Sequence, residues 1–162
     1  MNGDDMIEGV RIKKLKCIPD DRGFLMEMLR ADDQIFKGFG QIYITGCKKG
    51  IAKGWHYHKL QTDNFVCVLG TALVPLYDLR GNSKTRGEVN TFTLKAPLAE
   101  EHILLQIPPG VIHGFTPINC EEIRIVNIPD FPYQYSTPDE YRFPWNSKDI
   151  PFEWPKEVVN GG

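Results

Sequence analysis

Two histidines one residue apart, inside a stretch bounded by glycines, constrain this chain more than any other feature. Residues 50–70 read G-I-A-K-G-W-H-Y-H-K-L-Q-T-D-N-F-V-C-V-L-G and place Asp63 shortly after His56 and His58. On a β-strand alternate side chains point to the same face, so the two histidines would project together. Because burying two imidazoles without partners is costly, the pattern predicts a polar site on one face of a sheet. Two histidines on a solvated sheet face are the alternative.

The remaining chain predicts a single all-β domain over residues 1–162. Short segments of alternating or continuous apolar character end repeatedly at Gly or Pro, which is typical of an antiparallel sandwich or barrel. We expect strands within 10–18, 24–30, 41–47, 65–79, 89–94, 102–108, 111–115 and 122–128. The barrel core would span about residues 7–129. The aromatic- and proline-rich tail, residues 130–162, would pack on the barrel or on a second subunit, with a short helix starting near Thr137.

Composition excludes several classes of function. A formal net charge of -2 at pH 7 gives no basic surface for nucleic acid and no membrane-surface signature. No apolar run approaches transmembrane length, and the polar start M-N-G-D-D is unlike a signal peptide. The four cysteines form no C-x-x-C pair, which favours reduced thiols in a cytoplasmic protein.

The spacing of the histidine stretch resembles a known motif. Gly50, His56, His58, Asp63 and Gly70 match the layout of the first cupin motif, with Asp in the usual place of Glu. The segment P-P-G-V-I-H, which ends at His113, resembles the P-x-G-x-x-H of the second cupin motif. The chain is therefore similar to cupins, and this resemblance implies a jelly-roll barrel with its site in the mouth.

Five segments in register resemble the dTDP-4-dehydrorhamnose 3,5-epimerases more narrowly. They are D-R-G-F with Glu27, K-G-W-H-Y at residues 53–57, D-L-R with S-K-T-R-G at residues 78–87, I-P-P-G-V-I-H-G-F at residues 107–115, and the closing I-P-F-E-W-P. The resemblance implies a homodimeric isomerase that needs no metal or other cofactor. Its substrate would be a nucleotide-linked 4-keto-6-deoxy sugar, modified in deoxysugar biosynthesis.

The family pattern also implies roles for individual residues. His56 takes the position of the base that removes a proton next to the C4 ketone. The positions that contact substrate fall on Arg22 and Lys53 (diphosphate), Glu27 and Gln41 (nucleotide or sugar), and His113 (pocket wall). Lys53 replaces an arginine, which keeps the charge but loses bidentate geometry.

Two family positions are occupied by unexpected residues. The lysine of the family's Q-x-K falls on Asp63, and the catalytic tyrosine falls on Asn127 when the second site tyrosine is set at Tyr133. A carboxylate cannot stabilise an enolate unless it is protonated or holds a cation. We expect His58, Asn127 and Tyr133 in the same pocket as His56, with Tyr133 as the substitute acid.

Three alternative functions remain open on the sequence. The segment 54–58, G-W-H-Y-H, resembles the G-x-H-A-H of dTDP-4-keto-6-deoxyglucose 3,4-ketoisomerases, in which a pair such as His56 and His58 could move a proton between adjacent carbons. A metal-dependent cupin would use His56, His58, Asp63 and His113 as ligands for Fe(II), Mn, Ni or Zn. A sugar-nucleotide binder without catalysis would account for the missing tyrosine and lysine.

Overall fold

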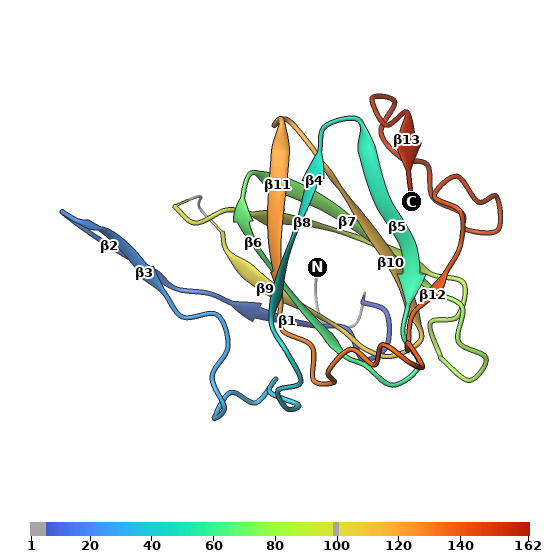
Figure 1. Cartoon of the computed structure of the whole chain (residues 1–162), viewed down its shortest axis with the longest axis horizontal. Helices are drawn as coiled ribbons and strands as arrows, with labels where there is room; N and C mark the ends of the chain where they lie inside the picture. The colour runs from blue at the N-terminus through green and yellow to red at the C-terminus, as the bar shows by residue number, and fades with distance from the viewer. Residues whose placement is uncertain (1–5, 99–100) are drawn as a thin grey trace.

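The computed structural model describes residues 6–98 and 101–162, and these fold into two antiparallel sheets that face each other (Figure 1). The first sheet has the order β1 (Arg11–Lys14), β9 (Ile103–Ile107), β6 (Asp63–Leu69), β11 (Glu122–Asn127), β4 (Tyr43–Lys48). The second has the order β12 (Tyr141–Arg142), β5 (Ile51–Tyr57), β10 (Val111–Pro117), β7 (Thr71–Asp78), β8 (Val89–Lys95). A short strand β13 (Asn160–Gly161) runs parallel to β5.

Successive strands of the central chain cross repeatedly from one sheet to the other. β4, β6, β9 and β11 belong to the first sheet, whereas β5, β7, β8 and β10 belong to the second. Apart from β7 and β8, neighbouring strands of the two sheets are therefore not consecutive in sequence, as in a jelly roll. This confirms the predicted all-β cupin architecture.

The core lies between the two sheets and is built from their inward-facing side chains. Alternation along each strand sends one set of residues inward, where burial of apolar surface stabilises the fold. The largest fully buried side chains include Phe65, Leu76, Leu94, Leu105 and Ile125. The apolar run after Asp63, expected to be buried, supplies several of them.

The C-terminal tail contains no helix, so the prediction of a short helix at Thr137 is wrong. Asp139, which would have lain in its first turn, instead accepts hydrogen bonds from the backbone N–H groups of Lys59 (2.9 Å), Leu60 (2.8 Å) and Gln61 (3.1 Å). The carboxylate thus ties the tail to the loop after β5, and this tertiary contact outweighs the local helix signal. The described residues also contain no helix that could span a membrane.

The tail packs on the outer face of β5 through aromatic residues. Trp55 is 1% exposed, its ring lies 4.6 Å from that of Trp154 and 5.6 Å from that of Phe152, and its Nε1 donates to the carbonyl of Trp145 (3.0 Å). The tail therefore covers the strand that carries the histidine pair and helps hold it in place.

A two-stranded hairpin, β2 (Cys17–Asp20) and β3 (Gly23–Met26), projects away from the sandwich (Figure 1). The extended segment expected over residues 10–18 is therefore divided, because β1 ends at Lys14 and pairs with β9 instead. Phe24 and Leu25 on the hairpin are 49% and 58% exposed. Such apolar exposure on a protruding element is typical of a surface that contacts another chain.

The segment D-L-R-G-N-S-K-T forms a hydrogen-bonded cluster around Asp78 at the end of β7. Asp78 is fully buried and accepts hydrogen bonds from Arg80 Nε (2.9 Å), Ser83 Oγ (2.5 Å) and Thr85 Oγ1 (2.7 Å). These bonds fold the loop after β7 back onto the strand. The D-L-R-G-N-S-K-T segment therefore stabilises the loop after β7.

Replacing Asp78 by alanine should lower the free energy of unfolding by about 3 kcal/mol, because a buried pair loses one partner while Arg80 stays partly solvated. Burial alone would raise the pKa of Asp78, but hydrogen bonds from Arg80, Ser83 and Thr85 hold it below 3.8. The contribution is thus present at neutral pH and is lost as pH falls through the folded-state pKa. Urea unfolding at pH 7 measures the effect, with exposed Glu88→Ala as the control; equal stability of the two variants would contradict it.

Candidate active site

Strand pairing brings three histidines together at one end of the sandwich. His113 on β10 lies directly opposite His56 on β5, with ring centroids 4.1 Å apart. His58, just beyond the end of β5, has its ring 6.0 Å from each of them. One ring nitrogen from each histidine lies within 4.8 Å of the others. The H-x-H spacing and the second motif thus converge on one site.

Asp63, the first residue of β6, reaches this site from the opposite sheet. Its Oδ2 lies 3.4 Å from His58 Nε2 and 3.3 Å from His113 Nε2. Its Oδ1 accepts hydrogen bonds from Gln61 Nε2 and Asn127 Nδ2, both at 2.7 Å. The carboxylate is 1% exposed, so these neighbours are its whole environment.

The second ring nitrogen of each buried histidine faces a backbone carbonyl. His58 Nδ1 contacts the carbonyl of Asp139, and His113 Nδ1 lies 2.9 Å from that of Val111. A carbonyl only accepts, so each Nδ1 carries a hydrogen and each Nε2 of a neutral ring would turn a lone pair toward Asp63. Among the described residues His113 Nε2 has no hydrogen-bond partner, although Asp63 lies nearby. The cluster therefore requires at least one additional proton, or a cation.

Asp63 itself stays ionised in this environment. Burial alone would raise the pKa of Asp63, but the imidazole of His113, followed by that of His58 and the hydrogen bond from the Asn127 amide, holds it below its usual range. Asp63 thus places a fixed negative charge between the imidazoles of His58 and His113.

His56 differs from the other two histidines. It is half-buried, and none of the hydrogen bonds within the described part of the chain uses its ring. Burial, and next the charge of His113, lower the pKa of His56 well below 6.5. A neutral imidazole with unengaged nitrogens is suited to accept a proton from a bound molecule.

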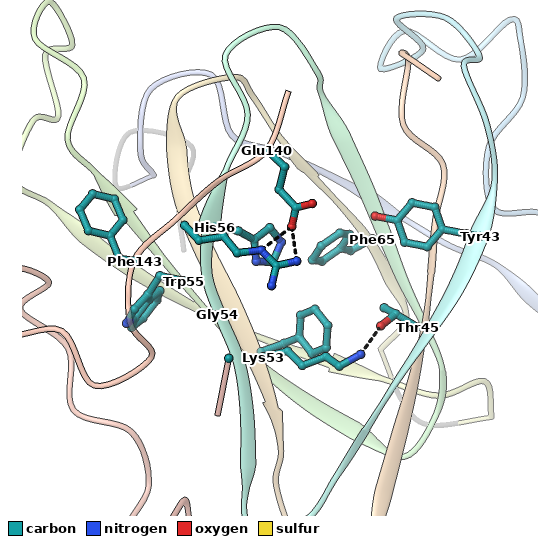
Figure 2. Close-up of a pocket in the computed structure, with 12 residues that line it drawn as sticks. Tyr43, Thr45, Lys53, Gly54, Trp55, His56, Phe65, Glu140 and Phe143 are labelled. Atoms are coloured by element: carbon teal, nitrogen blue, oxygen red, sulfur yellow. Dashed lines mark hydrogen bonds and ion pairs between the residues drawn. The ribbon is translucent and has the colours of Figure 1, made fainter. Parts of the chain in front are cut away.

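His56 opens onto two adjoining cavities between the sheets. One, of about 310 Å³, is drawn in Figure 2, where Lys53 and His56 of β5 face Tyr43 and Thr45 of β4. The other, of about 340 Å³, is lined by Gln41, Tyr43, His56, His58, Gln61, Tyr133 and Glu140. Their combined size suits a sugar with part of a nucleotide.

Eight of the ten residues expected from the sequence lie at or directly behind these cavities. Gln41, Lys53, His56, His58 and Tyr133 line them, whereas Asp63, His113 and Asn127 are buried behind the wall. Arg22 and Glu27 lie elsewhere in this chain: Arg22 pairs with Asp20 on the hairpin, and Glu27 pairs with Arg30. Their predicted contacts with substrate stay predictions.

Tyr43, Glu140 and Arg142 are among the cavity residues that were not expected from the sequence. Tyr43 lines both cavities. The sequence pattern that could have indicated it is the alternation of Gln41, Tyr43 and Thr45 with two isoleucines. Glu140 and Arg142 come from the tail, where Arg142 on β12 pairs with His56 in register and donates to Glu140 (2.6 Å). No local pattern marks these two, because a chain reversal brings them to β5.

Comparison with known proteins finds relatives over nearly the whole chain. A family model described as dTDP-4-dehydrorhamnose 3,5-epimerase matches residues 4–161. The spore coat polysaccharide biosynthesis protein SpsL of Bacillus subtilis is 38% identical over 94% of this chain and 99% of its own. The probable low-salt glycan biosynthesis epimerase Agl13 of Haloferax volcanii is 34% identical over 94% of this chain and 97% of its own.

Solved structures show the same arrangement of strands. The crystal structure of a dTDP sugar isomerase from Desulfovibrio desulfuricans G20 superposes with a TM-score of 0.84 at 32% identity. The match covers 91% of this chain and 92% of that one. The likeness therefore extends over about nine tenths of both chains.

Proposed function

The chain belongs to the dTDP-4-dehydrorhamnose 3,5-epimerase family, and from this premise we propose that it epimerises a nucleotide-linked 4-keto-6-deoxy sugar in deoxysugar biosynthesis. The observation that carries the proposal is His56, a neutral imidazole that opens onto both cavities without a hydrogen bond inside the described chain. His56 removes the proton from a carbon next to the C4 ketone, and an enolate results. The enzyme is an isomerase acting on carbohydrates.

The enolate oxygen needs a positive group or hydrogen-bond donors near it. Asp63 stands where the family pattern has lysine, but it lies against the imidazoles of His58 and His113. Of these two histidines, His58 lines a cavity. His58, held by Asp63 and by the carbonyl of Asp139, stands at the cavity wall where it can take the place of the missing lysine.

Two cations in the first cavity suit the diphosphate of a nucleotide sugar. Lys53 Nζ donates to Thr45 Oγ1 (3.0 Å), and Arg142 pairs with Glu140. In these bonds the only partner of Lys53 is the neutral hydroxyl of Thr45. The charge of Lys53 is therefore available to a phosphate oxygen. This agrees with the diphosphate role that the family pattern implies for Lys53.

Incubation with dTDP-4-keto-6-deoxyglucose in deuterated water tests the function directly. Deuterium at C3 and C5 would support 3,5-epimerisation. Deuterium at C3 alone would leave 3-epimerisation and 3,4-ketoisomerisation by the His56 and His58 pair, which NMR of the product separates. Binding of the nucleotide sugar without any deuterium uptake would sink the catalytic proposal and leave a binding protein.

We also infer a homodimer in the cytoplasm, where nucleotide sugars meet a reducing environment that suits four free cysteines. The projecting hairpin carries Arg22 away from its own cavities. At the edge strand β4, Ile44 and the preceding Ile42 are each 59% exposed. A second copy would cover these apolar groups and could receive Arg22 at its site.

Light scattering should therefore give the mass of two 18.5 kDa chains. Deletion of the hairpin, residues 17–26, should shift the mass toward one chain, because the exposed Phe24 and Leu25 are then no longer present to contact a partner. A monomeric full-length chain at micromolar concentration would refute the dimer.

A metal-binding site is the second candidate, and one observation favours it. His58 and His113 point Nε2 toward Asp63 with Nδ1 held by backbone carbonyls, which is how metal-ligating histidines are usually oriented. The ring nitrogens of His56, His58 and His113, within 4.8 Å of one another, fit a divalent transition metal, which would polarise a ketone oxygen. Metal analysis of untagged protein tests this candidate. A stoichiometric ion that is lost in His58→Ala would show that the cluster binds a metal.

A further inference from the structure

Tyr43 forms a cross-strand pair with Asn127, and the pair determines the direction of its hydroxyl. The two residues are opposite each other in the β4–β11 register. Asn127 Nδ2 donates to Tyr43 Oη (2.8 Å) and also to Asp63 Oδ1 (2.7 Å). The phenol oxygen is thus the acceptor, and no hydrogen bond within the described residues uses its own proton. That proton is available to a molecule in the cavity.

Tyr43 and His56 lie on different sheets and share both cavities. Tyr43 belongs to β4 of the first sheet and His56 to β5 of the second, and the two side chains line the 310 Å³ and the 340 Å³ cavity alike. Figure 2 shows the hydroxyl of Tyr43 directed inward from the wall opposite β5. A sugar ring between them would present one face to each residue.

Inversion at a carbon requires that arrangement. A proton that leaves from one face must be replaced on the other, so a single base that returns its own proton only restores the starting configuration. On the basis of the proposed epimerisation, we propose that Tyr43 is the catalytic acid that protonates the enolate carbon on the face opposite His56. The family pattern has its tyrosine on β11, at the position that Asn127 occupies here. In this chain the acid is instead on β4, directly opposite Asn127.

The steps balance as follows for one carbon. His56 takes the proton as the C–H bond breaks, and the electron pair moves onto the ketone oxygen as an enolate. The enolate carbon then takes the proton of the Tyr43 hydroxyl, which leaves a phenolate, and the ketone is restored. The phenolate regains a proton from water, and the protonated His56 returns one to water.

The surroundings of Tyr43 suit a donor that stays loaded until it is used. Burial, and next the charge of Asp63, raise the pKa of Tyr43 to about 12, so the phenol is protonated at neutral pH. The N–H of Asn127 is already aimed at the oxygen and would stabilise the phenolate after transfer. Tyr133, by contrast, lines only the second cavity and belongs to the tail.

Tyr43→Phe tests the assignment because it removes the hydroxyl alone. In deuterated water with dTDP-4-keto-6-deoxyglucose, His56 should still exchange the proton, so deuterium should accumulate in substrate of unchanged configuration. Formation of the epimerised product should fall by about 10²-fold or more, with KM changed little. Tyr135→Phe, at an exposed tyrosine outside the cavities, is the matched control and should match the wild type.

The outcomes separate this inference from the function on which it rests. Wild-type protein that takes up no deuterium refutes the epimerase itself. If the wild type is active and Tyr43→Phe forms product at the wild-type rate, only the role of Tyr43 is refuted. The role of Tyr43 is also refuted if Tyr133→Phe, rather than Tyr43→Phe, gives exchange without inversion. It is refuted as well if Tyr43→Phe is folded and still binds dTDP but loses both exchange and product formation.

Discussion

Replacing His56 by glutamine is expected to lower kcat for epimerisation by about 10²- to 10⁴-fold, the usual contribution of a positioned general base. Deuterium exchange into the substrate should fall by the same factor, because both processes begin with the same proton removal. Steady-state rates and NMR of the exchanged substrate measure the two effects. An unchanged exchange rate would show that another group is the base.

The pH dependence provides an independent reading of the same residue. Burial and the charge of His113 keep the pKa of His56 well below 6.5, with Asp63 alone among the nearby charges raising it and His58 and Arg142 lowering it further. The unprotonated base therefore persists in mild acid, and kcat/KM should hold as pH falls below 6.5. His102→Gln is the control, since His102 lies outside the cluster and contacts Leu15 through its backbone carbonyl.

Replacing Asp63 by alanine is expected to lower the free energy of unfolding by about 3–5 kcal/mol. The change removes the buried negative charge between His58 and His113 and leaves the amides of Gln61 and Asn127 without their acceptor. Both amides belong to buried residues, so water does not replace the lost bonds. Urea unfolding measures the loss, and a variant as stable as the wild type would show that the carboxylate is dispensable for folding.

Asp63→Asn separates the charge of this residue from its shape. The amide oxygen can still accept from Gln61 and Asn127, and the amide nitrogen can donate to the Nε2 lone pairs of two neutral histidines. The fold should therefore survive better than in the alanine variant. Activity should fall nonetheless, because the negative charge that faces His58 and His113 is lost. Full activity in Asp63→Asn would exclude a role for the charge.

Much of the fold could be predicted because it depends on local patterns. Alternation and glycine or proline breaks indicated strands, and the spacing from Gly50 to Gly70 with the second motif indicated the cupin jelly roll. The short helix at Thr137 failed for an equally physical reason. Local propensity favoured it, but three backbone N–H groups of a distant loop made a better partner for Asp139.

The site was predictable where strand geometry alone decides which face a side chain takes. His56 at the end of β5 and His58 just beyond it converge on one site, as the alternation of an extended chain predicts, and His113 joins them through a motif of known spacing. Arg22 and Glu27 were expected near the same site, but the hairpin carries both away from the cavities of their own chain. No local pattern indicates in which direction a hairpin projects.

The sequence by itself thus determined that this chain forms a β-sandwich with two imidazoles on one strand face and a carboxylate nearby, since these follow from periodicity and spacing. Only the tertiary structure decided how they interact. Pairing across the sheets turned Asp63 from an apparent misfit into the anchor of His58 and His113, and register on β4 and β11 placed Tyr43 beside Asn127. The contacts of Asp63 with His113 and of Tyr43 with Asn127 join residues 50 and 84 positions apart, and they depend on how strands pair and sheets pack, which no short stretch of sequence encodes.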